Sequence, residues 1–429
     1  MNILMISNTY SPHVGGVARS VAAFASEYRE AGNRVVVVAP EFDGMPEDEE
    51  DTIRVPAIQN FNGSDFSVRL PIPGLISSAL EDFRPDIVHS HHPFLLGDTA
   101  LLLSASQNAP LTFTHHTMYE QYTHYVPGDS PALQRFVVEL STGYANLCDM
   151  VFAPSESIAE VLRKRGVQSP IEIVPTGVRR EALAEGDGDG FRAALNIPRD
   201  AFVVGHLGRL APEKNMDFLS RSVVGFLKSN PNARFLLIGV GPSLEIVKGH
   251  FEKNRLAQRL HVAGILKGRE LADAYRAMDV FAFASKSETQ GMVLTEAMAQ
   301  GVPVVAIDAP GVREVAVHER NGRLLARENT ADFAAALSWV ASLPPDKLNA
   351  MKRAARETAG TFSMGRTAAL ALSHYESLLT RKRRDRNAES GPWLSAMRLF
   401  EKEWDIWVNR AHAAGAALQD QQSSSSAGK

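Results

Sequence analysis

Short runs of β-branched and other apolar residues alternate with longer segments of helical periodicity over most of the chain. Such runs, nearly continuous in apolar residues and too short for helices, are typical of parallel strands buried on both faces. In the first half we expect strands at residues 3–7, 35–39, 86–89, 111–114, 150–153 and 172–174. In the second half we expect strands at residues 202–207, 234–238, 261–263, 280–284 and 302–307.

The run EGDGDG at residues 185–190 has no periodicity and separates the two halves. Each half begins with a strand, a glycine-containing loop and a helix, which predicts two doubly wound α/β domains at residues 1–180 and 201–365, joined by a linker at 181–200. We expect them to face each other across a cleft, because ligands bind such sheets outside the carboxyl ends of the strands. After them we expect a helix at 366–380, a basic and amphipathic helical tail at 381–413 and a disordered end at 414–429.

The composition is that of an ordinary globular protein. Of the 429 residues 45% are hydrophobic and 22% charged, and the net charge is −4, which argues against a nucleic-acid-binding protein. A single cysteine, Cys148, excludes an internal disulfide and argues against a zinc-thiolate site. The chain begins with a predicted strand rather than a signal peptide, and we find no stretch long and apolar enough to span a membrane. We therefore expect a cytoplasmic protein.

The clearest chemical signal lies between residues 285 and 305. A strand ends near residue 284, a polar loop carries Glu288 and Gly291, and a helix follows at 292–300. The amide groups at a helix start suit a phosphate, whereas carboxylates such as Glu288 and Glu296 accept hydrogen bonds from sugar hydroxyls. Either glutamate alone has an equally good structural explanation, as a solvated loop residue or a residue favouring a helix start.

Two cations complete this pattern. Arg209 and Lys214 lie in the loop after the first strand of the second domain, where an arginine can clamp phosphate oxygens and a lysine adds a point charge. Together with Glu288, Gly291 and Glu296 they indicate a ligand that carries both phosphate and sugar.

These residues resemble a known family. The run from Gly208 to Asn215 matches the signature GR-x-x-x-EKN, and Glu288 with Glu296 matches E-x7-E. Both motifs are typical of family 4 of the retaining glycosyltransferases, and the resemblance covers about residues 1–380. It implies the GT-B fold, an α/β architecture of two Rossmann-like domains facing across a cleft, with the C-terminal helices crossing back. The first domain would bind the acceptor and the second the nucleotide-sugar.

The resemblance also implies roles for single residues. Arg209 and Lys214 would bind the donor diphosphate, Glu288 the transferred sugar and Glu296 the ribose hydroxyls. The backbone of Gly291, Met292 and Val293 would cradle phosphate and hexose. The family has no metal-binding motif, so we expect no metal site and no cofactor beyond the nucleotide-sugar donor.

In the first domain, Gly15 and Gly16 follow the first strand at a helix start, where a phosphate or sugar can approach the backbone. A Gly-Gly pair is more often only a turn, but in the resembling family this loop closes on the donor. Residues 114–127 form a loop rich in His, Tyr and Thr after a strand, which can bind hydroxyl groups. There His116 corresponds to the family's histidine near the reacting carbon. We name His115, Tyr119 and His124 as acceptor-binding candidates.

The same loop narrows the resemblance. The run from His115 to Pro127 is similar to the HTMYE-x-Y-x-HY segment of bacterial diacylglycerol glucosyltransferases, which transfer glucose from UDP-glucose to a membrane diacylglycerol. The segment 175–178 also fits this subgroup, whereas Arg179 stands where Asp is common. A further histidine cluster, His89, His91 and His92, lies at a strand end. It could line the cleft or pack as structure, and a metal role is the weakest alternative.

The resemblance implies front-face attack with retention, in which the leaving phosphate takes the acceptor proton. Arg209, Lys214 and the helix start near Gly291 would stabilise the leaving diphosphate, and such electrostatic stabilisation is usually a large part of catalysis. Catalysis would thus rest on His116, Arg209, Lys214 and Glu288, with His116 orienting the sugar or acceptor.

A lipid acceptor requires a membrane, and the tail has features that suit an anionic membrane surface. Basic residues fill 381–386, and one stripe of the following helix is apolar. The stripe consists of Trp393, Met397, Phe400, Trp404, Trp407 and Ala411. Packing of this stripe on the first domain is an equally good explanation. A second candidate for membrane contact is the helix at 17–30.

The sequence therefore favours a peripheral membrane hexosyltransferase that moves glucose from UDP-glucose to diacylglycerol. One alternative is a mannosyl- or other hexosyltransferase acting on a phosphoinositide, polyprenyl or saccharide acceptor. A more remote alternative is a non-catalytic scaffold that binds a sugar nucleotide, against which the intact Arg209, Lys214, Glu288 and Glu296 argue.

Overall fold

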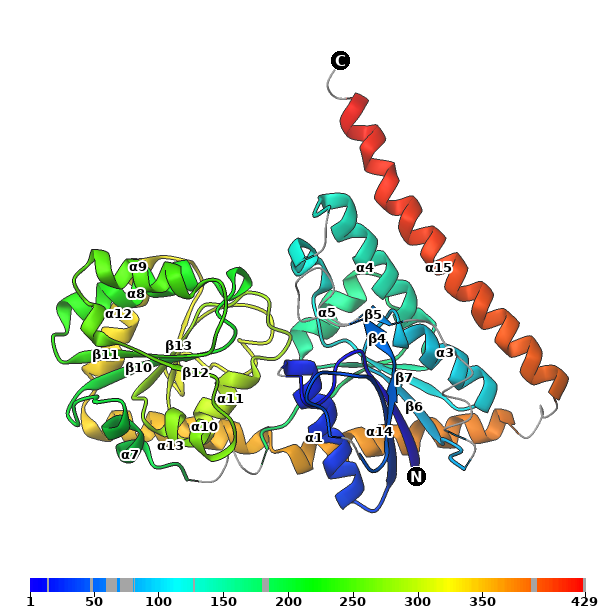
Figure 1. Cartoon of the computed structure of the whole chain (residues 1–429), viewed down its shortest axis with the longest axis horizontal. Helices are drawn as coiled ribbons and strands as arrows, with labels where there is room; N and C mark the ends of the chain where they lie inside the picture. Colours follow the sequence, from blue (N-terminus) through cyan, green and yellow to red (C-terminus); the bar gives the residue numbers. More distant parts are fainter. Residues whose placement is uncertain are drawn as a thin grey trace. The chain divides into compact units, whose positions relative to one another are not determined.

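The structure is a computed structural model of the whole chain (Figure 1). It describes residues 1–429 except 14, 47–48, 59–67, 70–79, 81, 126–127, 180–184, 387–391 and 427–429. The chain forms two compact units. Unit 1 consists of Met1–Pro175 and Thr367–Lys429, and unit 2 consists of Thr176–Arg366.

Unit 1 is built on a seven-stranded sheet in the order β3-β2-β1-β6-β7-β8-β9. All neighbouring strands in it are parallel. Its strands are β1 (Asn2–Ile6), β2 (Arg34–Pro40), β3 (Thr52–Val55), β6 (Ile87–Ser90), β7 (Leu111–Thr114), β8 (Met150–Ala153) and β9 (Ile171–Ile173). The order reverses between β1 and β6, as in Rossmann-like sheets. The expected strands are thereby found; β3 and the short pair β4 (Ala57–Ile58) and β5 (Val68–Arg69) are additional.

Helices cover both faces of this sheet (Figure 1). They are α1 (Gly16–Glu30), α3 (Leu96–Gln107), α4 (Pro131–Asn146), α5 (Glu156–Lys164), α14 (Met364–Arg386) and α15 (Pro392–Ser426). One core cluster joins the sheet to α3, α4 and α5 and includes Ile406 of α15. Elsewhere in unit 1, Tyr28 of α1 and Tyr375 of α14 are completely buried against each other, with 3.3 Å between their hydroxyl oxygens.

Unit 2 repeats this architecture with six parallel strands in the order β12-β11-β10-β13-β14-β15. The strands are β10 (Phe202–Leu207), β11 (Ala233–Ile238), β12 (Leu260–Gly264), β13 (Val280–Phe283), β14 (Val304–Ile307) and β15 (Gly322–Leu325). The helices are α7 (Gly188–Ala194), α8 (Met216–Ser229), α9 (Leu244–Lys253), α10 (Gly268–Arg276), α11 (Met292–Ala299), α12 (Thr330–Ala341) and α13 (Pro345–Thr361). Two separate core clusters fill this unit, one built with α8, α9 and α12 and the other with α10, α11 and α13.

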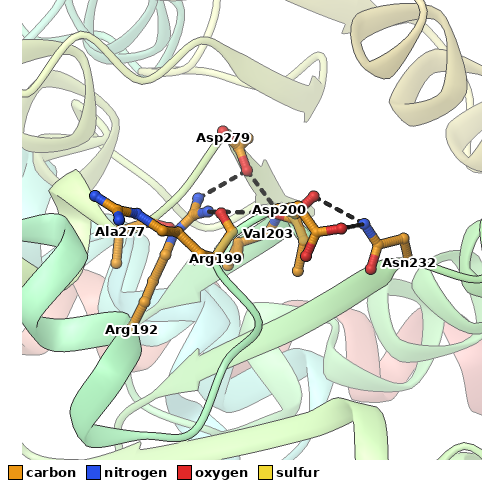
Figure 2. A network of polar contacts seen from close by, with 8 residues as sticks. Arg192, Arg199, Asp200, Val203, Asn232, Ala277 and Asp279 are labelled. Carbon is orange, nitrogen blue, oxygen red and sulfur yellow. Dashed lines mark hydrogen bonds and ion pairs between the residues drawn. The ribbon is translucent and has the colours of Figure 1, made fainter.

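The expected linker at 181–200 contains a folded element. Residues Gly188–Ala194 form α7, whose start is capped by Asp187 through a hydrogen bond from the Gly190 amide. Arg192 attaches this helix to the segment just before β13, a central strand of the sheet, by donating to the Ala277 carbonyl at 2.8 Å and to Asp279 at 2.8 Å (Figure 2). The sequence predicted a linker because this segment is rich in glycine and has no apolar periodicity. The helix forms nevertheless, because contacts with the rest of unit 2 hold it in place.

The C-terminal helices belong mostly to unit 1. Helix α14 begins in unit 2 at Met364, and from Thr367 onward it belongs to unit 1, followed by α15. The expectation of a disordered end from residue 414 was wrong, because α15 continues to Ser426. The alanine-rich segment 411–417 has high helix propensity, which explains the continuation. No helix in the described part of the chain has the length and apolar character needed to cross a membrane.

Candidate functional site

In unit 2 the predicted donor residues gather at the point where the strand order reverses, between β10 and β13. The loop after β10 carries Arg209 and Lys214, and the loop after β13 carries Glu288. Ligands of doubly wound sheets bind outside the carboxyl ends of the strands at such a reversal. The sheet topology therefore brings together residues that are about 75 positions apart in the sequence.

Lys214 and Glu288 form the central contact of this site. The Lys214 ammonium lies 2.5 Å from Oε1 of Glu288, and the two side chains are only 18% and 17% exposed. Burial acts to raise the pKa of Glu288, but the Lys214 ammonium and a hydrogen bond from Ser285 outweigh it, so the pKa lies below its usual value. Glu288 is thus ionised at neutral pH and can accept hydrogen bonds from hydroxyl groups.

His206, which the sequence analysis did not single out, lies at the end of β10 close to this pair. Its Nδ1 lies 2.9 Å from the Ala282 carbonyl oxygen, and its buried Nε2 has no hydrogen-bond partner among the described residues. Burial, assisted by the Lys214 charge, lowers the pKa of His206 to about 4. The ring is therefore neutral at pH 7. Its position at a strand end beside the quoted motif was the signal that could have identified it.

Helix α11 starts beside Glu288 with the backbone that an anion site requires. Gly291, its N-cap residue, has φ +72° and no side-chain cap, as suits a glycine in the left-handed region. Gly311 packs against the backbone of the loop before α11, since a Cβ at Gly311 would lie 2.4 Å from the Gln290 amide nitrogen. Met292 and Val293, in the first turn, are half-buried. The Leu294 amide donates to the Gly291 carbonyl at 2.9 Å. The amides of Met292 and Val293 stand at the helix start, where amides lack carbonyl partners within the helix and can bind a phosphate.

Gln290 fixes the loop before α11, and this residue too was missed in the sequence. Its side-chain carbonyl accepts a hydrogen bond from the Thr176 amide at 2.5 Å, and its side-chain amide donates to the Thr176 carbonyl. Both partners belong to unit 2, and the Gln290 side chain is buried. The segment 175–178, noted above only for its resemblance, is thereby attached to the glutamate-bearing loop.

Glu296 and Arg209, the two other donor residues expected in unit 2, differ in exposure. Glu296 lies in α11, is 6% exposed, and accepts a hydrogen bond from the Tyr275 hydroxyl at 2.9 Å. This contact orients the carboxylate from within the unit. Arg209 follows β10 and is exposed. The structure thus places Arg209, Lys214, Glu288, Gly291 and Glu296 on the loops and helix at one end of the sheet.

In unit 1 the corresponding reversal lies between β1 and β6. Gly15 is the N-cap residue of α1 with extended backbone angles, φ −154° and ψ 158°. A Cβ at Gly16 would meet no described atom within 4 Å, so packing inside the unit does not require this glycine. The open approach fits a backbone contact with a ligand.

A cluster of histidines fills the ends of β6 and the neighbouring β7. His91 is completely buried, and its Nδ1 lies 2.9 Å from Nε2 of His116. The rings of His89 and His91 are tilted against each other with 4.1 Å between their centroids, and Nδ1 of His89 lies 2.5 Å from the Tyr375 hydroxyl of α14. A series of buried rings therefore supports His116: Tyr375 of α14 contacts His89, His89 contacts His91, and His91 contacts His116.

These histidines are uncharged at neutral pH. Burial lowers the pKa of His116 well below its usual value, and the neighbouring rings of His92, His89 and His115 add to the effect. Burial lowers the pKa of His89 and of His92 to about 3. Neutral imidazoles can orient hydroxyl groups through one donor and one acceptor nitrogen. Among the described residues, no group of three or more His, Cys, Asp or Glu side chains is arranged to hold a metal ion.

The three acceptor-binding candidates lie at different depths. His115 is 0% exposed, packs edge-on against Phe113 and Tyr119, and has a pKa lowered to about 3 by burial. Tyr119 is half-buried, and burial raises its pKa. His124 is exposed beside Tyr125. Of the three, His124 is accessible to a ligand, whereas the hydroxyl oxygen of Tyr119 is buried and His115 is an interior ring of unit 1.

The two sheets and their reversal points define a protein of two Rossmann-like domains, the GT-B fold of nucleotide-sugar-dependent glycosyltransferases. The model of Glycosyltransferase Family 4 matches residues 14–182, and the model of Glycosyl transferases group 1 matches residues 188–358. The chain belongs to this glycosyltransferase family and is a hexosyltransferase by class.

Two relatives illustrate the range within the family. The chain is 27% identical to the alpha-monoglucosyldiacylglycerol synthase of Acholeplasma laidlawii, over 71% of this chain and 80% of the relative. It is 31% identical to the D-inositol 3-phosphate glycosyltransferase of Saccharomonospora viridis, over 68% of this chain and 70% of the relative. The first name gives a product, monoglucosyldiacylglycerol, and the second gives an acceptor, D-inositol 3-phosphate.

Two solved structures share the fold. Sucrose-phosphate synthase from Thermosynechococcus elongatus has a TM-score of 0.73 and 21% identity, with 89% of this chain and 99% of that one covered. The Anabaena protein HepE in complex with UDP-glucose has a TM-score of 0.67 and 20% identity, with 87% and 100% covered. At these identities the likeness concerns the fold.

Proposed function

We propose that this glycosyltransferase moves a glucosyl group from UDP-glucose to the free hydroxyl of diacylglycerol at an anionic membrane surface, with retention of configuration. The observation that carries the proposal is the buried Lys214–Glu288 pair beside the start of α11. A site with an ionised carboxylate, a cation and helix amides suits a ligand that carries both hydroxyls and phosphate.

The donor half of the proposal follows from these contacts. Arg209, Lys214 and the amides of Gly291, Met292 and Val293 bind the diphosphate, and Glu288 accepts hydrogen bonds from the hexose. Glu296, oriented by Tyr275, accepts from the ribose hydroxyls. The HepE complex, whose title names UDP-glucose, and the monoglucosyl product in the name of the A. laidlawii relative support this donor.

The reaction needs charge stabilisation rather than a protein nucleophile. The bond from the anomeric carbon to the phosphate oxygen breaks, and its electron pair stays on the diphosphate. The acceptor oxygen then bonds to the anomeric carbon from the same face, and its proton passes to the departing phosphate oxygen. Lys214, Arg209 and the α11 amides stabilise the growing negative charge where it develops.

His116 orients the acceptor hydroxyl in this proposal. Its neutral ring is held by His91 at 2.9 Å, so that its direction is fixed before a ligand binds. His124 contributes an accessible side chain and Tyr119 a half-buried ring to the acceptor region, and Gly15 and Gly16 provide a backbone approach. Because His115 is interior, we assign it a packing role that supports this loop.

A second candidate function is supported by the relative from S. viridis. Its name assigns it an inositol phosphate acceptor, and its identity of 31% exceeds the 27% of the glucosyldiacylglycerol synthase. The alternative is therefore a mannosyl- or other hexosyltransferase with a phosphoinositide, polyprenyl or saccharide acceptor. The loop HHTMYEQYTHY favours diacylglycerol through its similarity to diacylglycerol glucosyltransferases.

The test is a transfer assay with matched donors and acceptors. The purified chain is incubated with UDP-glucose, UDP-galactose or GDP-mannose, and each donor is combined with diacylglycerol in anionic vesicles or with D-inositol 3-phosphate. Labelled glycolipid from UDP-glucose supports the proposal. A labelled inositol phosphate product would instead support the second candidate function.

A further inference from the structure

Helix α15 has two unlike faces, and only one of them is used in packing. It runs beside α4 and α3 within unit 1 (Figure 1). On the inner face Ile406 is 7% exposed and Ala413 is 0% exposed. Asn409 of the same face donates to the Leu140 carbonyl of α4 at 3.1 Å.

The outer face carries large apolar side chains that point away from unit 1. The exposed fractions are 72% for Phe400, 64% for Trp404 and 67% for Trp407. Met397 and Val408 on the same side are 45% and 50% exposed. These five residues, the α15 stripe, recur at helical spacing on the side opposite Ile406 and Ala413. Of the stripe expected from the sequence, Met397, Phe400, Trp404 and Trp407 are therefore not part of the core of unit 1. Val408 is an addition to that stripe, and the side chain of Trp393 lies outside the described residues.

Contacts at the sides of the helix keep this face turned outward. Arg410 lies 2.5 Å from Asp98 of α3, and Arg398 donates to the Ala105 carbonyl at 3.4 Å. Rotating α15 to bury the stripe would break these contacts and expose Ile406 and Ala413. The exposure is therefore a property of the folded unit.

The side chains of the α15 stripe are of the kinds that bind a lipid surface. Trp404, Trp407 and Phe400 are the exposed tryptophan and phenylalanine side chains among the described residues, and tryptophan favours the boundary between headgroups and acyl chains. A monomeric protein seldom exposes a continuous apolar patch of this kind without a function. By contrast, no large hydrophobic side chain is exposed on α1, the second candidate helix.

Charge complementarity points in the same direction. The sequence from Arg381 to Arg386, at the end of α14 and shortly before α15, contains five cations and one aspartate. Glu401 and Glu403 are exposed on α15, but the helical period places them at the two edges of the stripe rather than within it. Cations close in sequence to an apolar helix face are typical of segments that bind anionic lipid.

We propose that the α15 stripe docks unit 1 on an anionic lipid bilayer, with the helix lying in the plane of the interface. This inference extends the proposed lipid acceptor and explains how the enzyme reaches it. The surface lies on the outer side of unit 1 and does not use the donor or acceptor residues. Membrane binding by this surface can therefore be measured without the glycosyl transfer reaction.

The experiment is co-sedimentation of the full chain with vesicles of phosphatidylglycerol and phosphatidylcholine that contain no diacylglycerol. We expect the triple variant Phe400→Ser/Trp404→Ser/Trp407→Ser to lose binding by at least about tenfold, since three apolar side chains no longer enter the interface. A matched control, Ile246→Ser/Val317→Ser/Leu370→Ser, removes three exposed apolar side chains elsewhere and should bind as the original chain does.

Controls for folding, a second variant and a fluorescence measurement keep the result interpretable. Circular dichroism and the melting temperature check that the triple variant is folded, and the variant Trp404→Phe/Trp407→Phe should retain vesicle binding. Brominated lipids should quench tryptophan fluorescence in the original chain more than in the triple variant. Vesicle binding without transfer to diacylglycerol would leave the docking surface standing and reject the proposed acceptor.

Two results would overturn the inference. One is equal vesicle binding by the triple variant and the original chain. The other is a molar mass that falls from dimer to monomer in the triple variant while vesicle binding is unchanged, which would make the stripe an interface between two copies of this chain. Light scattering after size-exclusion chromatography measures that mass.

Discussion

Lys214 and Glu288 stabilise each other's charged forms inside unit 2, so that removing one takes the counter-charge away from the other, which is largely buried. We expect Glu288→Leu and Lys214→Met each to lower the free energy of unfolding by about 3 kcal/mol. The double variant should lose less than the sum of the two. Urea unfolding of all four proteins measures the coupling, and losses that add within about 0.5 kcal/mol would show that the pair is not coupled.

The histidine cluster predicts a pH dependence of stability. His89, His92 and His115 have folded-state pKa values of about 3, below the usual 6.5. Between these values the unfolded chain binds more protons than the folded chain, so the free energy of unfolding is highest above pH 6.5 and falls as the pH decreases. At pH 5 the loss amounts to about 2 kcal/mol for each histidine.

Urea unfolding at pH 7.5 and at pH 5.0 tests this expectation. The variant His92→Asn should reduce the difference between the two pH values, because it removes one titrating group. A free energy of unfolding that stays constant between these pH values would contradict the burial of neutral histidines.

Among single residues, the sequence indicated the members of the donor site that belong to a motif and missed those that do not. Arg209, Lys214, Glu288 and Glu296 carry a recognisable spacing, and the structure gathers them at one end of the unit 2 sheet. His206 and Gln290 have no such spacing, because their contacts with Ala282 and Thr176 are made across the fold. Likewise, no periodicity in the sequence indicates that His91 holds His116.

Among the elements, α7 is attached to unit 2 by Arg192, by the Asp187 amide that donates to Asp273, and by Phe191, which packs on a core cluster. Arg192 is 13% exposed and donates to Asp279 and to the carbonyls of Ala277 and Ala201 (Figure 2). We expect Arg192→Met to lower the free energy of unfolding of unit 2 by about 3 kcal/mol, because these acceptors lose their donor.

Arg199 provides the matched control. It lies near Arg192 but is 87% exposed in its ion pair with Asp189. Arg199→Met should therefore change the free energy of unfolding by less than about 0.5 kcal/mol. Equal effects of the two substitutions in thermal or urea unfolding would reject the anchoring role of Arg192.

The elements that the sequence identified best are the buried strands, whose apolar runs have few alternative explanations. The edge strands β3 and β15 were not expected, because their sequences TIRV and GRLL are short and partly polar. Helix α15 was expected, but its two faces could not be assigned. Which side of an amphipathic helix is buried depends on the surface it meets, here α3 and α4.

For the whole molecule, the division into units makes a prediction about truncation. Unit 1 is completed by α14 and α15, and Tyr375 and Ile406 are part of its buried interior. A chain ending at Arg366 should therefore be strongly destabilised in unit 1, whereas a chain ending at Ala417 should unfold as the full chain does. Limited proteolysis and thermal unfolding compare the two. A stable unit 1 in the shorter chain would contradict the assignment of these helices.

The most direct test of the account is glucosyl transfer from UDP-glucose to diacylglycerol in anionic vesicles. The full chain should form labelled glucosyldiacylglycerol, and Lys214→Ala and Glu288→Ala should lower the rate by about a hundredfold or more, as expected for lost charge stabilisation. UDP-galactose and GDP-mannose serve as donor controls. Absence of labelled lipid with every donor, or unchanged transfer in both variants, would contradict the proposed reaction at this site.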